Sequence, residues 1–155
     1  MTDPQPIIPQ SRQAEDAGRW TTASIGKGGF RTDVTAGGKE LVVDEPVSVG
    51  GSDLGPTPYE YLLTALAGCT LMTLRMYADR KEWPLESATV QLRSGRSHEI
   101  DCEKCATEPV GIGHIQRRIE LTGPITDEQR QRLLAIADRC PIKQTLERGI
   151  HIENA

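Results

Sequence analysis

The sequence predicts an α+β fold, in which two groups of short strands are separated by helices. Three observations support this class: glycine-punctuated extended segments near the N-terminus, a long capped helical tract in the middle, and two alternating strands before a second capped helix. The predicted order is three strands, a helix, two strands, a helix and a final strand. This order lacks the regular strand–helix–strand repeat of a parallel α/β protein.

Composition bounds the size and the class of the protein. The chain has 155 residues, which is enough for one self-sufficient core and argues against two domains. Only 37% of the residues are hydrophobic, so a further apolar surface, such as a dimer interface, would help the chain fold. Lys and Arg number 18 against 22 Asp and Glu, and this weakly acidic balance argues against nucleic acid as the main partner.

The sequence pattern shows no signal for a membrane or for export. No apolar run approaches the ~20 residues of a membrane-spanning helix. The first residues lack the basic start and the apolar stretch of a secretion signal. We therefore expect a cytoplasmic protein that does not act at a membrane.

The N-terminal third of the chain predicts an arm and a small sheet. Residues 1–19 combine three prolines with polar residues and show no periodicity, which predicts a loose arm. We expect residues 20–155 to form a single domain. Its first part alternates short extended segments with glycine turns at residues 26–29 and 37–38, a pattern typical of a three-stranded antiparallel meander.

A capped helical tract follows a loop at residues 46–57. Thr57 and Glu60 have the spacing of a capping box, with Pro58 at the first helical position. The tract YLLTALAGCTLMTLRMYADRK carries apolar residues around more than one narrow stripe, which predicts a largely buried helix. The residues expected to be buried are Leu62, Leu63, Leu66, Cys69, Met72, Leu74 and Met76.

The second half of the chain predicts two strands and another helix. Residues 87–94 and 114–123 alternate apolar and polar side chains and are separated by a polar excursion. Thr126 and Gln129 form a second capping-box pattern, which opens a helix that Pro141 ends or bends. Residues 142–149 are expected to add one more turn, and residues 150–152 a short final strand.

The four cysteines are the residues most suited to a chemical role. In a reducing compartment, cysteines are more often reactive or metal-binding than structural. Cys69 lies within the apolar helical tract, where a small core side chain is the simplest interpretation. Cys140 precedes Pro141, at a bend that often exposes a side chain. Together the two also suit a peroxide-reducing pair, in which one thiolate attacks and a second thiol traps the sulfenic acid.

Three segments resemble the OsmC/Ohr proteins, which are osmotically inducible protein C and the organic hydroperoxide resistance proteins. They are GPTPYEYLL, the AGCT segment with Cys69, and ADRCP with Cys140, and the likeness runs from about residue 28 to the C-terminus. The resemblance implies an OsmC/Ohr-like fold, with antiparallel sheets packed on a central helical tract. It also implies an intertwined homodimer whose sites lie at the interface.

The same resemblance implies the roles of four residues. Cys69 would attack the peroxide and Cys140 would resolve the product, while Glu60 would hold Arg31 beside the attacking thiolate. Arg31 would lower the thiolate pKa and bind the peroxide oxygens, and in the intertwined dimer it would serve the site of the partner. A pure capping role for Glu60 and a solvated position for Arg31 are the alternatives.

Helix geometry raises a difficulty for this arrangement. Glu60 and Cys69 are nine residues apart, so on a continuous helix they lie ~13.5 Å apart along the axis and half a turn out of phase. Either Arg31 bridges them from another element, or the helix breaks near Gly68, a weak point in a helix interior. A break would place Cys69 at the start of a second helix, where the dipole favours a thiolate, and we expect this break.

A second pair of cysteines lies in the polar excursion. Cys102 and Cys105, with His98 and His114, give the pattern His-x3-Cys-x2-Cys-x8-His, which supplies four ligand types that zinc accepts. Free or reversibly oxidised thiols in a polar loop are the interpretation that we favour. No metal and no cofactor are therefore expected.

The sequence thus predicts a thiol-dependent peroxidase that reduces organic hydroperoxides in oxidative stress defence. An external dithiol, of lipoyl type for example, would reset the homodimeric enzyme. The side chains of Leu62, Leu66, Met72 and Met76 are candidates to line its site. The alternative is a non-catalytic dimer of the same family that binds small molecules or senses thiols.

Overall fold

The computed structural model describes residues 20–95, 101, 103–107 and 110–154. The predicted N-terminal arm, residues 1–19, lies outside the described residues. The chain divides into two compact units, one that ends at Pro58 and one that begins at Tyr59. The expectation of a single domain over residues 20–155 stays a prediction, and each unit is described by itself.

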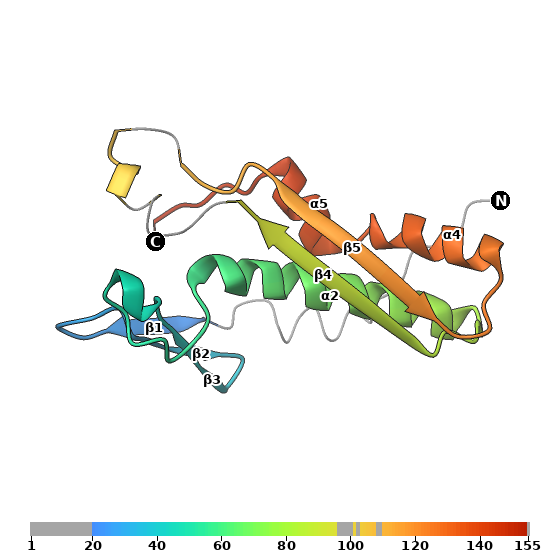
Figure 1. The fold of residues 1–155 in the computed structure, drawn as a ribbon, viewed down its shortest axis with the longest axis horizontal. Helices are drawn as coiled ribbons and strands as arrows, with labels where there is room; N and C mark the ends of the chain where they lie inside the picture. The colour runs from blue at the N-terminus through green and yellow to red at the C-terminus, as the bar shows by residue number, and fades with distance from the viewer. Residues whose placement is uncertain (1–19, 96–100, 102, 108–109, 155) are drawn as a thin grey trace. The chain divides into compact units, whose positions relative to one another are not determined.

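The first unit contains the predicted three-stranded meander. Its antiparallel sheet has the order β1-β2-β3, with β1 at Thr22–Ile25, β2 at Thr32–Ala36 and β3 at Lys39–Val43 (Figure 1). Gly37 and Gly38 form the tight turn that joins β2 to β3, between the paired residues Ala36 and Lys39. Their φ angles are +56° and +75°. Two adjacent positive φ angles suit glycine and fit the turn that twists with the strands, so the sequence-based prediction is confirmed.

A buried carboxylate orders the loop after β3, which includes the short 3₁₀ helix η1 at Val47–Val49. Asp44 is 1% exposed and accepts hydrogen bonds from the amides of Glu45, Ser52 and Leu54 at 2.8, 3.2 and 3.2 Å. Burial opposes ionisation of this carboxyl, but the three amides and the charge of Arg31 outweigh it. The pKa of Asp44 is therefore lower than usual.

The second unit packs helices against a two-stranded sheet. The long helix α2 covers Pro58–Arg80, and the antiparallel strands β4 and β5 cover Ser87–Ser94 and Ile115–Thr122. Two further helices follow, α4 at Asp127–Ala137 and α5 at Pro141–Arg148. Figure 1 shows β4 and β5 side by side, with their ribbons crossing α2. The architecture is α+β, as the sequence predicts.

The core of this unit lies between α2, the sheet and α4. Alternate residues of β4 and β5 are partly buried, as the alternating pattern predicts. Leu74 and Leu133 are fully buried, and each supplies apolar surface from a different helix. The buried cluster comprises Leu74, Tyr77, Ala78, Leu85, Leu121, Leu133, Ile136 and Ala137.

The starts of α4 and α5 test two predictions about the second half of the chain. The capping box at α4 is confirmed, because the Thr126 hydroxyl accepts from the Gln129 amide at 3.1 Å and the Gln129 side chain accepts from the Thr126 amide at 3.0 Å. Pro141 does not merely bend this helix. It begins the separate helix α5, since proline is well suited to a first helical position.

The expected break near Gly68 is wrong. α2 is one continuous helix of 23 residues. Glycine costs about 1 kcal/mol in a helix interior, but Leu66 and Thr70 on either side are buried at 5% and 0% exposure. Tertiary packing on both sides of the glycine therefore outweighs its low helix propensity.

Two other expectations also fail. Residues 150–152 form no strand, and within the described part of the chain no strand pairs with them; Ile150 and Ile152 are 65% and 86% exposed. Met72 and Met76 on α2 are 67% and 56% exposed, so this helix is not buried on every side within one chain. None of the described helices has the length and hydropathy that a membrane crossing requires.

Candidate active site

The fold brings Cys69 and Cys140 together, although 71 positions separate them in the sequence. Cys69 lies in the middle of α2, and Cys140 directly precedes α5 as its N-cap residue. The two thiols interact with each other, and both are free. The amide of Ile142 points at the Sγ atom of Cys69 from 3.5 Å. The structure therefore places two thiols and the N-terminus of a helix at one point.

Local sequence explains how Cys140 reaches this position. α4 ends at Ala137, and Cys140 adopts an extended backbone with ψ at 125° before Pro141 starts α5. The chain thus turns between two helices, and the first amides of α5 point toward the thiols. Cys140 is fully buried at 0% exposure, and Cys69 is only half-buried. The expected order of burial is wrong, because the turn packs against α2 rather than projecting into solvent.

The surroundings shift the pKa values of the two thiols in opposite directions. Burial raises the pKa of the Cys69 thiol, and its hydrogen bond to the Cys140 sulfur raises it further, against smaller opposing contributions from the Ile142 amide and the Thr73 hydroxyl. Burial also opposes ionisation of Cys140. Four donors outweigh it and hold the pKa of Cys140 below its usual value: the Cys69 thiol, the amides of Lys143 and Ile142, and the Thr70 hydroxyl. These surroundings therefore favour ionisation of Cys140 over ionisation of Cys69.

Arg31 and Glu60, the other two predicted site residues, are both exposed. Arg31 belongs to the first unit, where its guanidinium binds Asp33 at 2.9 Å and is half exposed. Glu60 is exposed in the first turn of α2. Because α2 is continuous, Glu60 lies ~13.5 Å from Cys69 along the helix axis and does not reach its thiol. The prediction that Arg31 connects the two stays a prediction.

The candidate zinc ligands are only partly described. His98 and Cys102 lie outside the described residues, and Cys105 and His114 are both exposed. Within the described ranges, no group of three or more His, Cys, Asp or Glu side chains is placed to hold a metal ion.

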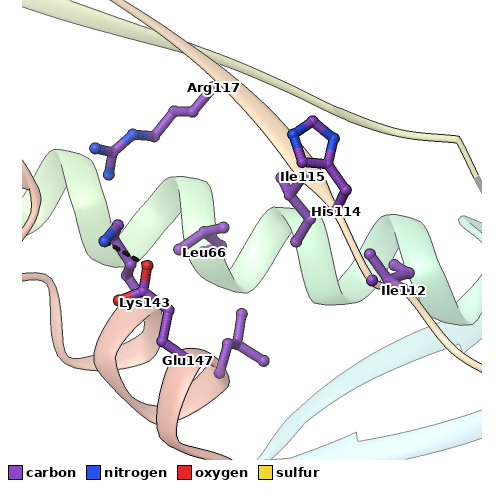
Figure 2. A pocket seen from close by; sticks show the side chains of 9 residues that line it. Leu66, Ile112, His114, Ile115, Arg117, Lys143 and Glu147 are labelled. Carbon is purple, nitrogen blue, oxygen red and sulfur yellow. Dashed lines mark hydrogen bonds and ion pairs between the residues drawn. The ribbon is translucent and has the colours of Figure 1, made fainter.

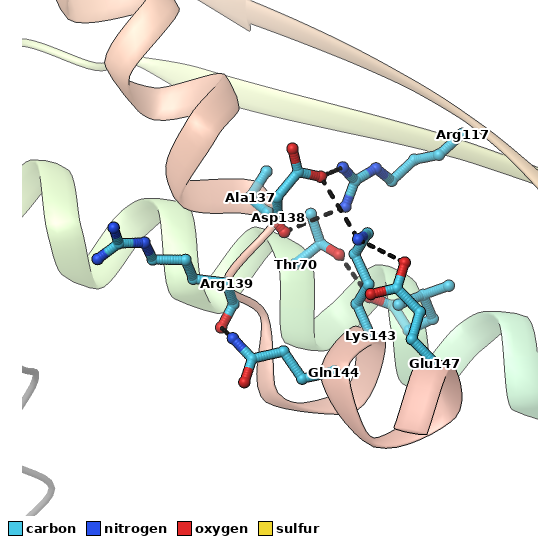
Figure 3. Close-up of polar contacts among 9 residues, drawn as sticks. Thr70, Arg117, Ala137, Asp138, Arg139, Lys143, Gln144 and Glu147 are labelled. Atoms are coloured by element: carbon cyan, nitrogen blue, oxygen red, sulfur yellow. Dashed lines mark hydrogen bonds and ion pairs between the residues drawn. The ribbon is translucent and has the colours of Figure 1, made fainter. Parts of the chain in front are cut away.

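An ion-pair network lies close to the thiol turn (Figure 3). Arg117 on β5 binds the carbonyl of Ala137 at 3.1 Å and the carboxylate of Asp138 at 2.6 Å. Lys143 on α5 lies 2.6 Å from Glu147 and 3.8 Å from Asp138. The network ties the end of α4 to β5 and to the first turn of α5, and so fixes the segment that carries Cys140.

A pocket of about 450 Å³ opens between α2, the start of β5 and α5 (Figure 2). Leu66, one turn before Thr70 on α2, contributes to its apolar lining, with Ile112, Ile115 and Leu146. Arg117, Lys143, Glu147 and His114 supply polar groups at the same pocket. Of the four residues expected to line a site, Leu66 lines this pocket, whereas Leu62, Met72 and Met76 are not among its lining residues.

Sequence reasoning missed Thr70, Arg117 and Lys143. Thr70 directly follows Cys69, so its proximity could have been noticed, but its contact with Cys140 depends on how α5 folds back. Arg117 sits in an alternating strand and has no local signal for a partner at the end of α4. Contacts between segments so distant in sequence need the tertiary structure.

Comparison with known proteins agrees with this fold. The family model for OsmC-like proteins matches residues 50–154, more than half of the chain. An OsmC-like protein of Mycoplasma pneumoniae has a TM-score of 0.67 and 21% identity, over 85% of this chain and 89% of that one. A putative osmotic stress induced and detoxification response protein of Psychrobacter arcticus has a TM-score of 0.65 and 20% identity, over 84% and 87%.

A further structural neighbour is named for hydroperoxide resistance. It is an organic hydroperoxide resistance protein, OsmC, from Legionella pneumophila, with a TM-score of 0.60 and 20% identity over 84% of this chain and 90% of that one. Identities this low carry the fold and not the activity. No curated protein sequence matches the chain at a significant level.

Proposed function

The chain belongs to the OsmC-like protein family and has the α+β fold of OsmC/Ohr proteins, and from this premise we propose that it reduces organic hydroperoxides with Cys69 and Cys140. The observation that carries the proposal is the closeness of two free thiols from distant parts of the chain: the amide of Ile142, two residues after Cys140, lies 3.5 Å from the Sγ atom of Cys69. A close pair of this kind, with one half-buried thiol and one buried thiol, suits a cycle in which one sulfur is oxidised and the other traps the product.

The proposed cycle has three balanced steps. The Cys69 thiolate attacks one peroxide oxygen, the O–O bond breaks, and an alcohol leaves with a proton while Cys69 becomes sulfenic acid. Cys140 then attacks the sulfenic sulfur, which forms a disulfide and releases water. An external dithiol, for example of lipoyl type, reduces the disulfide and is itself oxidised to a disulfide. Cys69 takes the first role because it is the half-buried thiol, whereas Cys140 has no exposed surface.

The attack requires the proton to move from Cys69 to Cys140. The resting surroundings favour the opposite distribution, since they raise the pKa of Cys69 and lower that of Cys140. A guanidinium beside Cys69 would shift the negative charge to it, which is the role that we assign to Arg31, oriented by Glu60. In a dimer this arginine would come from the partner chain.

The pocket beside Leu66 suits the organic part of a hydroperoxide. Its lining combines isoleucine and leucine side chains with a few polar groups, and Leu66 lies within one turn of Cys69 on α2. An apolar site of this type favours alkyl and aryl hydroperoxides over hydrogen peroxide, because only the former bury apolar surface on binding.

We also infer a homodimer. Met72 and Met76 lie one turn apart on α2, and both side chains are more than half exposed. Neighbouring large apolar side chains on one helix are seldom left this exposed in a monomer. A second copy would cover this surface. Sedimentation of the purified protein tests it: twice the mass of the chain is expected, and a monomer at micromolar concentration would contradict the inference.

The activity is tested by counting thiols. Reduced protein is mixed with one equivalent of cumene hydroperoxide, and free thiols are titrated before and after. The proposal predicts the loss of two thiols, no such loss in the Cys69→Ser variant, and continued peroxide consumption when a dithiol is supplied. Unchanged thiols in the wild-type protein at excess peroxide would instead leave a binding or thiol-sensing protein of the same family.

A further inference from the structure

The proposed cycle, on which this inference rests, needs Cys140 in two protonation states. Cys140 carries the proton while Cys69 attacks the peroxide, and it must be a thiolate when it attacks the sulfenic sulfur. In that second step the S–O bond of Cys69 breaks as the S–S bond forms, and the proton released by Cys140 leaves with the oxygen as water. The groups around Cys140 must therefore accommodate both an S–H and an S⁻.

Most partners of Cys140 suit only one of these states. The amides of Lys143 and Ile142 belong to the first turn of α5 and can only donate, so they stabilise the thiolate. The paired charged groups on the surrounding elements are Arg117 on β5, Asp138 after α4, and Lys143 and Glu147 on α5. Arg139, directly before Cys140, is exposed.

Thr70 differs from the amides. Its side chain is fully buried and its hydroxyl donates to the Leu66 carbonyl oxygen at 2.8 Å. The same hydroxyl lies near enough to the Cys140 sulfur to lower the pKa of that thiol. A hydroxyl has one donor hydrogen and two acceptor positions. The same side chain can therefore meet either state of Cys140 by a rotation about its C–O bond.

We propose that Thr70 is a positioning residue for disulfide formation, which stabilises Cys140 first as a thiol and then as a thiolate. With Cys140 protonated, Thr70 donates to the Leu66 carbonyl and accepts from the thiol. With Cys140 ionised, the hydroxyl turns and donates to the sulfur. The Leu66 carbonyl keeps its helical hydrogen bond from the Thr70 amide throughout, so the rotation leaves no buried acceptor without a partner.

Three variants separate the effect of the Thr70 hydroxyl from the effect of side-chain volume. Thr70→Val keeps the shape and removes the hydroxyl, and Thr70→Ser keeps the hydroxyl. Thr64→Val is the matched control, because Thr64 also bonds a carbonyl one turn back on α2 but is exposed. All proteins carry Cys102→Ser and Cys105→Ser, so that only the pair reacts.

The kinetic test follows the two oxidation steps separately after one equivalent of cumene hydroperoxide. Sulfenic acid formation is measured in a Cys140→Ser background by trapping with dimedone, and disulfide formation is measured by quenched-flow mass spectrometry. Thr70→Val should slow disulfide formation about tenfold, the effect of one hydrogen bond to a charged group. Its pH profile should move to higher pH, and Thr70→Ser and Thr64→Val should behave as the parent.

A titration tests the same assignment without peroxide. In a Cys69→Ser background, thiolate absorbance reports the ionisation of Cys140, and Thr70→Val should raise its pKa by about one pH unit. An unchanged titration overturns the assignment, as does an equal effect of Thr70→Ser, which would indicate volume rather than the hydroxyl. If no cysteine reacts with peroxide in any protein, the proposed function fails, and the titration alone decides the role of Thr70.

Discussion

Arg117 offers the most informative structural perturbation near the thiols. Its side chain is 18% exposed and donates to the Ala137 carbonyl at 3.1 Å and to Asp138 at 2.6 Å. These bonds satisfy the end of α4, which comes three residues before Cys140. Arg117→Met keeps the aliphatic stem and removes both bonds. We expect it to destabilise the protein and to loosen the turn that positions Cys140.

The expected loss of stability in Arg117→Met follows from the two groups that Arg117 binds. A charged donor on a buried carbonyl contributes about 1.5–2 kcal/mol, and the pair with Asp138 adds only about 0.5 kcal/mol because that carboxylate is 59% exposed. The sum is about 2 kcal/mol, or a fall of roughly 4–8 °C in Tm for a chain of this size.

Denaturant unfolding and thermal melting measure the change. Arg118→Met is the matched control, since Arg118 is the next residue of β5 and is exposed. Equal stabilities of the two variants would refute the reasoning. So would a destabilised Arg117→Met protein whose Cys140 forms the disulfide at the parental rate, because the network would then not position the thiol.

The remaining predictions concern the scaffold. Leu133→Ala, at a fully buried position, should lose about 3 kcal/mol in denaturant unfolding, and a loss below about 1 kcal/mol would contradict the core assignment. Gly123→Ala should be strongly destabilising by the same assay, because φ is +123° and the new Cβ would lie 2.4 Å from the Pro84 carbonyl oxygen, whereas Gly95→Ala meets no atom within 4 Å and should be tolerated. Asp44→Asn should lower the Tm at neutral pH. Because the pKa of Asp44 is lowered in the folded state, this difference should persist above the unfolded pKa and vanish as the pH falls through the folded one; a pH-independent difference would contradict the role of the charge.

Features set by local sequence were predictable. The glycine pair at 37–38 requires a tight turn, and the Thr126–Gln129 spacing is a self-contained cap, so the meander and the start of α4 could be placed from the sequence. The alternation of β4 and β5 was equally local. The family resemblance supplied the overall fold that these elements build.

Features set by tertiary contacts were not predictable. Gly68 weakens a helix in isolation, but burial of its neighbours holds α2 together. Cys140 is buried only because α5 folds back onto α2, and nothing local indicates this. The apolar pattern of α2 predicts burial of Met72 and Met76 but does not specify whether the same chain or a second copy covers them.

The central claim is that Cys69 and Cys140 form one redox pair. Peptide mapping under non-reducing conditions, after one equivalent of cumene hydroperoxide and blocking of free thiols, tests it most directly. The account predicts a single new cross-linked peptide that joins Cys69 to Cys140, which disappears on treatment with a dithiol. A disulfide that involves Cys105, or a Cys69 that proceeds to sulfinic acid while Cys140 stays reduced, would contradict it.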